Sequence, residues 1–168
     1  NLGVTFQRIG RLEEAETCHK KAISIKPDYA EALNSLGNTL KELGRLEEAE
    51  TCHKKAISIK PDYAEALNSL GNTLKELGRL EEAEVSYRKA IKLKPDYAGA
   101  YYNLSNNLSY MNDLEKEINA LKNVLKSDAD DFGLKAGVNL AICNFLEGDF
   151  AESKKQVLAA EKIQEKTL

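Results

Sequence analysis

The sequence is poor in several residue types: its 168 residues include no tryptophan, one methionine, three prolines and three cysteines. Three cysteines spread over a chain of this length do not make a disulfide framework, so we expect a reducing compartment and a cytoplasmic location. No apolar run approaches the roughly 18 residues that span a bilayer, so we expect no membrane insertion. The first residues also lack a basic start and a signal-like apolar stretch.

The charge pattern excludes another class of function. The net charge is −3, and acidic and basic residues are interleaved along the chain rather than gathered into blocks. Nucleic-acid binding needs clustered Lys and Arg that displace counterions, so we expect no nucleic-acid partner. The chain is 42% hydrophobic, which suits a soluble domain with a core. It starts at Asn1 without methionine, so we interpret it as a piece of a longer protein.

An internal repeat organises most of the chain. Residues 10–50 recur letter for letter as residues 44–84, with a period of 34 residues. The three prolines, Pro27, Pro61 and Pro95, follow the same step. Repeats of this length indicate a solenoid, in which each unit buries its apolar face against its neighbours.

One complete unit predicts two helices. Asp62 and Glu65 form a capping-box pattern at the start of a helix over 62–77, whose leucines recur at three- and four-residue spacing. Gly78 ends this helix, because glycine adopts the left-handed conformation without steric cost. A second helix over 79–94 follows, and the next proline cannot continue it. The fold class is therefore all-α, with antiparallel helix pairs.

This arrangement of large and small residues resembles the tetratricopeptide repeat family. In two successive units the pattern is carried by Leu33, Leu36, Gly37, Leu40, Ala49, His53 and Pro61, and by Leu67, Leu70, Gly71, Leu74, Ala83, Tyr87 and Pro95. The resemblance covers nearly the whole chain. It implies a right-handed α-solenoid superhelix of helix pairs that binds other proteins.

The repeats are less regular toward both ends. In the fourth unit Ser105 replaces the helix glycine, Asn112 replaces the turn glycine, and Glu117 replaces an alanine. In the fifth unit, which needs two residues inserted near 127–133, Asn144 stands where a large apolar residue is expected. We predict a single domain, 1–168, that consists of a truncated repeat 1–27, complete repeats 28–61 and 62–95, a degenerate repeat 96–129, and a fifth repeat with a C-terminal helix, 130–168.

The resemblance implies that the first helices line a concave groove for an extended peptide or a partner helix. The leucines must face the paired helix, so the remaining faces supply the candidate groove residues: Asn34, Asn38, Lys41, Asn68, Asn72, Lys75, Tyr102, Asn103, Asn106, Tyr110 and Lys135. Asparagine is a mediocre helix former, so we interpret its abundance as a ladder of amides that hydrogen-bond a peptide backbone. The alternative is that these asparagines bridge neighbouring repeats or face water.

Two binding modes of the family match only in part. The repeats are similar to those of O-linked N-acetylglucosamine transferase, but its asparagine ladder is matched by Asn1 and Asn103 alone, because serines fill that place in the two complete units. The carboxylate clamp of chaperone adaptors is matched by Asn72, Asn103 and Lys135. Two of the three cations that the clamp needs are missing, which leaves it weak for a carboxylate pair.

Other functions stay open at this stage. The segment is alternatively the substrate-presenting arm of a larger enzyme of the glycosyltransferase or sulfotransferase type, or a scaffold that self-associates through its repeat ends. The aromatic residues Tyr102, Tyr110 and Phe145 do not stand at positions that the 34-residue pattern assigns to the core. They are therefore candidate anchors for a partner. For Phe145 the rival interpretation is burial against a following repeat.

The Cys-His pairs at 18–19 and 52–53 invite a metal or nucleophile interpretation that the helix geometry disfavours. Adjacent helix positions lie about 100° apart, so one sulfur and one imidazole do not converge on an ion. The copies stand one repeat apart, on the order of 10 Å, against metal–ligand distances of ~2.0–2.3 Å. We expect core-filling histidines, outward-facing thiols, and neither a metal, a cofactor nor an enzyme site.

Overall fold

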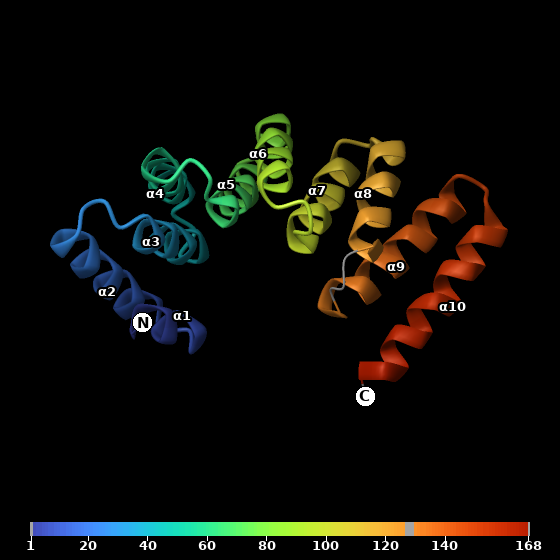
Figure 1. Ribbon diagram of the computed structural model, residues 1–168, viewed down its shortest axis with the longest axis horizontal. Coiled ribbons are helices and arrows are strands. Elements are labelled where there is room, and N and C mark those ends of the chain that lie inside the picture. Colours follow the sequence, from blue (N-terminus) through green and yellow to red (C-terminus); the bar gives the residue numbers. More distant parts are fainter. Residues whose placement is uncertain (1, 127–129, 168) are drawn as a thin grey trace. The chain divides into compact units, whose positions relative to one another are not determined.

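The computed structural model describes residues 2–126 and 130–167, and the side chains of 130, 131, 150 and 160–167 are not described. These ranges contain ten helices and no strand (Figure 1). In chain order the helices are α1 Leu2–Arg8, α2 Leu12–Ile25, α3 Ala30–Glu42, α4 Leu46–Ile59, α5 Ala64–Glu76, α6 Leu80–Leu93, α7 Ala98–Tyr110, α8 Leu114–Lys126, α9 Asp130–Leu146 and α10 Phe150–Thr167.

The helices fall into two compact units, α1 to α6 and α7 to α10. Within each unit every helix packs against the next one along the chain, and the colours of Figure 1 give the order of the helices. The first helices of adjacent repeats also touch, α3 against α5 in the first unit and α7 against α9 in the second. The prediction of an all-α fold built from helix pairs is confirmed, while the repeat boundaries and the insertion near 127–133 stay predictions.

The turns between paired helices use left-handed residues, as the sequence predicted. Gly78 has a φ of +75°, and Asn112 has a φ of +56° at the same place in the fourth repeat. Asparagine is among the few residues other than glycine that enter this region readily. Asn112 therefore preserves the turn although the glycine is gone.

The predicted start of this helix at Asp62 is two residues too early. Helix α5 begins at Ala64, and Tyr63 precedes it without a side-chain capping hydrogen bond. The main-chain carbonyl of Asp62 accepts a hydrogen bond from the N–H of Ala64 at 3.0 Å.

The repeat glycines allow a ring of the second helix to lie directly on the first helix. A Cβ atom added at Gly71 would stand 2.5 Å from Cε1 of Tyr87, and one added at Gly37 would stand 2.5 Å from Cε1 of His53. Tyr87 and His53 are both fully buried. Each helix pair is thus locked by a small residue on one helix and a large ring on the other, as close packing requires.

A double-mutant cycle tests this pairing. Gly71→Ser together with Tyr87→Leu copies the fully buried pair of the fourth repeat, Ser105 and Leu121. The serine alone collides with the tyrosine ring and should lower the free energy of unfolding by about 1–3 kcal/mol. The leucine alone leaves a void and removes the hydroxyl that donates to Asn72. In urea denaturation we expect the double variant to lose less than the sum of the single losses, by about 0.5–3 kcal/mol, and strictly additive losses would contradict the pairing.

Charged residues join successive second helices in the first unit. Arg79 contacts Glu50 of the preceding repeat at 2.8 Å and Glu82 of its own repeat at 2.6 Å. Arg45 makes the same pair of contacts one repeat earlier, with Glu16 and Glu48. These side chains are partly solvated, so each pair contributes little to stability, but the repetition fixes how neighbouring repeats align.

Candidate functional site

The first helices leave only a narrow face for a ligand, because each is packed on several sides. Helix α3 contacts α2, α4 and α5. Asn34 and Asn68 are consequently buried, with exposed fractions of 7% and 9%. The amide oxygen of Asn34 lies 3.0 Å from Nδ1 of His53, and its side chain is also hydrogen-bonded to the hydroxyl of Tyr63 in the next repeat. Asn34 thus bridges neighbouring repeats, as the alternative interpretation of the asparagines held.

Asn38 and Asn72 occupy a different position, one turn further along the same helices. Both are half-buried. The amide oxygen of Asn72 accepts a hydrogen bond from the Tyr87 hydroxyl at 2.8 Å. Among residues 2–126 and 130–167, the amide nitrogen of Asn72 and the whole amide of Asn38 have no hydrogen-bond partner. These two amides retain hydrogen-bonding capacity for a ligand.

Polar contacts between adjacent first helices run along one edge of this face. Lys41 contacts Glu76 at 3.0 Å, joining α3 to α5. Gln7 donates to Glu42 at 2.6 Å, which joins α1 to α3 one repeat earlier. Lys75, the equivalent of Lys41 in the next repeat, is half-buried. The charge of Lys41 is therefore paired with Glu76, and this contact also aligns α3 with α5.

In the second unit the candidates differ in their exposure. The ring of Tyr102 packs 5.5 Å from the ring of Phe132, centroid to centroid, and against the core between α8 and α9. The interpretation that Tyr102 has no place in the core is therefore wrong. Sequence reasoning missed the contact because the repeat pattern assigns no position to Phe132. Tyr110 is 71% exposed, and Lys135 is exposed as well, whereas Asn103 and Asn106 are half-buried. Asn1, the other ladder candidate, lies outside the described residues.

The histidines are core residues, as predicted. His19 and His53 are 1% and 0% exposed. Burial lowers the pKa of His53 to about 4, with a smaller contribution from the charge of Lys41. Burial also lowers the pKa of His19. Both rings are neutral at pH 7. Because the amide oxygen of Asn34 can only accept, the proton of His53 sits on Nδ1.

The expectation of exposed, outward-facing thiols is wrong, since Cys18 is half-buried and so is Cys52. Its side chain is half-buried and packs against the core cluster that contains Leu36 and Leu40. This burial raises the pKa of the thiol above its ordinary value. Sequence reasoning placed the residue by angle around its own helix and did not include the neighbouring first helix, which covers it.

Within residues 2–126 and 130–167, no group of three or more His, Cys, Asp or Glu side chains is arranged to hold a metal ion. No helix among those residues has both the length and the apolar character that crossing a membrane requires.

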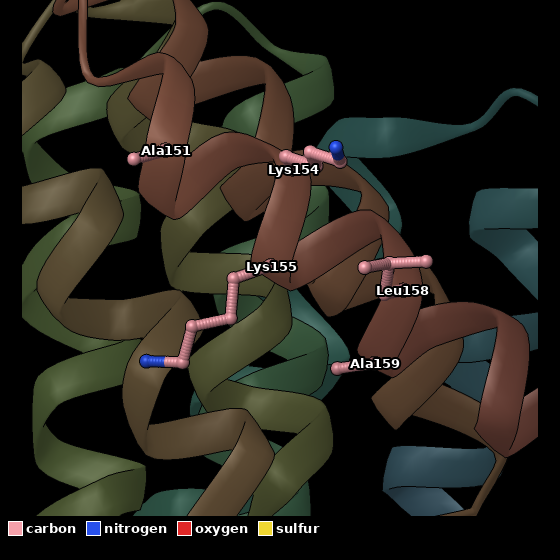
Figure 2. Close-up of a pocket in the computed structure, with 5 residues that line it drawn as sticks. All are labelled: Ala151, Lys154, Lys155, Leu158 and Ala159. Carbon is pink, nitrogen blue, oxygen red and sulfur yellow. The ribbon is translucent and has the colours of Figure 1, made fainter.

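Three surface hollows differ in what lines them. A hollow of about 400 Å³ on α10 is lined by Ala151, Lys154, Lys155, Leu158 and Ala159, all from that one helix (Figure 2). A second, of about 230 Å³, is apolar and lies between α9 and α10, where it is lined by Val138, Ala141, Ile142, Phe145, Ser153 and Val157. The third lies among α7, α8 and α9, and Asn106, Asn139 and Glu117 take part in its lining. The third brings polar groups from three helices together.

Sequence reasoning did not predict this third pocket, although it noted its main signal. Glu117 stands in the column that Ala15, Ala49 and Ala83 occupy in the other repeats. An acid in a column of buried alanines is a departure that packing alone does not explain.

The repeated part of the chain matches known protein families and solved structures. Family models described as "Tetratricopeptide repeat" match residues 1–62, 28–96 and 98–131. Among curated protein sequences none matches. The solved structure of MamA is similar with a TM-score of 0.86 and 24% identity, over 99% of this chain and 96% of that one.

Two further solved structures are similar over more than nine tenths of the chain. PilF from Pseudomonas aeruginosa has a TM-score of 0.85 at 22% identity, over 92% of this chain and 70% of that one. YrrB, described as a TPR protein with an unusual peptide-binding site, has a TM-score of 0.73 at 19% identity, over 98% of this chain and 84% of that one. At these identities the likeness shows a common fold.

Proposed function

Because the chain belongs to the tetratricopeptide repeat family, we propose that it is a protein–protein interaction module that binds an extended peptide or a partner helix along its first helices. Repeats of this family generally mediate interactions between proteins. We propose a binding module without a catalytic site of its own. Its three cysteines are free thiols, which suits the cytoplasmic location that we also propose.

One observation supports this function above the others. The amides of Asn38 and Asn72 stand at the same place on adjacent first helices, half-buried, with hydrogen-bonding capacity left over. An extended peptide carries N–H and C=O groups at regular intervals, and a side-chain amide can donate to one and accept from the other. Asn34 and Asn68 are too buried for direct contact, so in this proposal they position the helices instead.

The remaining candidates take graded roles in the proposal. Tyr110 is 71% exposed and is suited to cover part of a ligand. Lys135 is exposed on α9 and offers a positive charge. Lys41 is paired with Glu76, so we assign it to alignment of the helices.

Replacing both Asn38 and Asn72 by alanine should weaken peptide binding by about 1–3 kcal/mol, since each lost hydrogen bond is worth a net ~0.5–1.5 kcal/mol. The measurement is calorimetric titration with peptides selected on the protein from a random dodecapeptide library displayed on phage. Asn38→Ala alone should leave the thermal melt nearly unchanged, because no hydrogen bond within the described residues depends on the Asn38 amide. Asn72→Ala removes the acceptor of the buried Tyr87 hydroxyl and should lower the stability by about 1–3 kcal/mol.

A matched control separates this effect from a general loss of amides. Asn119 is exposed on α8, a second helix, and Asn119→Ala should leave peptide affinity unchanged. A library that yields no binder, or binders that ignore the loss of Asn38 and Asn72, would contradict the proposed function.

A further inference from the structure

The pocket among α7, α8 and α9 contains a buried carboxylate whose charge nothing nearby neutralises. Glu117 is 9% exposed, and no ion pair within the described parts of the chain includes it. Its hydrogen-bonding neighbour is the thiol of Cys143. A thiol is a weak donor, so it replaces only part of the hydration that the carboxylate loses on burial.

The thiol stays protonated beside this carboxylate. Burial raises the pKa of Cys143 to about 12, and the negative charges of Glu117 and Glu147 add to the effect. At neutral pH the S–H group therefore donates to Glu117, and the local field is negative. A cation entering the pocket meets the buried carboxylate of Glu117, whereas Glu147 is exposed and is not among the lining residues.

The rest of the lining suits a slender cationic group. Asn106 from α7 and Asn139 from α9 can turn amide oxygens toward a donor beside Glu117. Ile142 and Leu146, which are 54% and 68% exposed, supply apolar surface from α9. The cavity measures about 190 Å³. This is enough for one side chain and too little for a drug-sized ligand, which needs about 300 Å³ or more.

We propose that this pocket binds the side chain of a lysine residue in a partner peptide. The ammonium group has three donors, which match the three acceptors offered by Glu117, Asn106 and Asn139. The methylene stem lies along Ile142 and Leu146, as lysine stems lie along apolar surface elsewhere. Arginine fits less well, because its planar guanidinium group prefers a carboxylate that lies in the same plane and accepts two parallel hydrogen bonds.

The proposal rests on the proposed function, peptide binding by the first helices, and makes it specific. The proposal also explains why the fourth repeat has an acid at this position, whereas each of the first three repeats has an alanine. In the other repeats Ala15, Ala49 and Ala83 are 0% exposed and simply fill space. In this proposal Glu117 binds a ligand at a position where the other repeats have an alanine that only packs in the core.

The test is a titration of the full chain with Nα-acetyl-lysine methylamide, followed by NMR signals of the side-chain amides of Asn106 and Asn139. The neutral probe Nα-acetyl-norleucine methylamide has the same stem without the ammonium group. We expect the lysine probe to bind at least roughly tenfold more tightly, as a charge-assisted hydrogen bond implies. Equal binding of the two probes would overturn the proposal.

Three variants complete the design. Glu117→Gln keeps the volume without the charge, and Glu117→Ala restores the residue of the other repeats, so at least one variant should fold. Both should abolish the preference for the lysine probe, whereas Glu115→Gln, at an exposed position on the same helix, should preserve it. A preference that survives in Glu117→Ala would contradict the assignment.

The outcome is separable from that of the proposed function. In a peptide selected from the library, lysine is replaced by norleucine, and affinity is measured on the wild-type chain and on Glu117→Ala. If Asn38 and Asn72 matter for binding but the lysine replacement and Glu117→Ala do not, the lysine pocket is wrong and peptide binding stands. If the lysine probe binds through Glu117 and no peptide binds, the pocket stands and the proposed function fails.

Discussion

Replacing Leu40 by alanine is expected to lower the free energy of unfolding of the first unit by about 2–5 kcal/mol. Leu40 is 2% exposed and packs in a core cluster with Leu36 and Ala49. Truncation removes apolar contacts and leaves a void that tightly packed neighbours fill only in part. Urea denaturation followed by circular dichroism gives the change directly.

The effect should exceed that of an exposed leucine by a wide margin. Leu93, the last residue of α6, is 45% exposed, and Leu93→Ala should change the stability by no more than about 0.5 kcal/mol. Each repeat is stabilised chiefly by its own helix pair and by its neighbours. Equal losses at Leu40 and Leu93 would mean that the burial described for α3 is wrong.

Acid should destabilise the first unit through its buried histidines before its carboxylates titrate. The pKa of His53 is lowered from an ordinary value of 6.5 to about 4. Between these two values the unfolded chain binds a proton that the folded chain refuses, so stability is fully present above pH 6.5 and falls as the pH drops. At 1.36 kcal/mol per pKa unit, the loss from pH 7.5 to 4.5 is about 2–3 kcal/mol, and His19 acts in the same direction.

The third repeat suggests the matched control, because Tyr87 fills the same place as His53. In His53→Tyr the new hydroxyl should reach Asn38, as that of Tyr87 reaches Asn72. We expect the variant to be as stable as the wild type at pH 7.5 and to lose less stability by pH 4.5. The measurement is urea denaturation at both pH values, and an unchanged acid sensitivity would show that His53 is not the group responsible.

The sequence was sufficient to predict the helices and their pairing, because the determinants are local and repeated. Gly78 marks a turn through the conformation that only a few residues adopt, and Gly71 marks a close approach of Tyr87. The core role of His53 also followed from its column alone. Each of these inferences needed only the order of residues within one repeat and its copies.

The errors come from contacts that the position of a residue around its own helix does not show. The sequence placed Asn34 on a helix face directed away from α4, but α2, α4 and α5 surround α3 and bury this residue. Cys52 was placed outside although Leu36 and Leu40 of its own repeat cover it. The pocket of Glu117 was also beyond reach, because its lining comes from three helices whose relative placement no single repeat specifies.

The central claim is that a peptide binds on the first helices, and the most direct test is an NMR titration with a library-selected peptide. The account predicts that the side-chain amide signals of Asn38 and Asn72 shift on binding, while those of Asn119 and Asn123 on the second helix α8 stay in place. Shifts confined to second helices, with Asn38 and Asn72 unmoved, would contradict it.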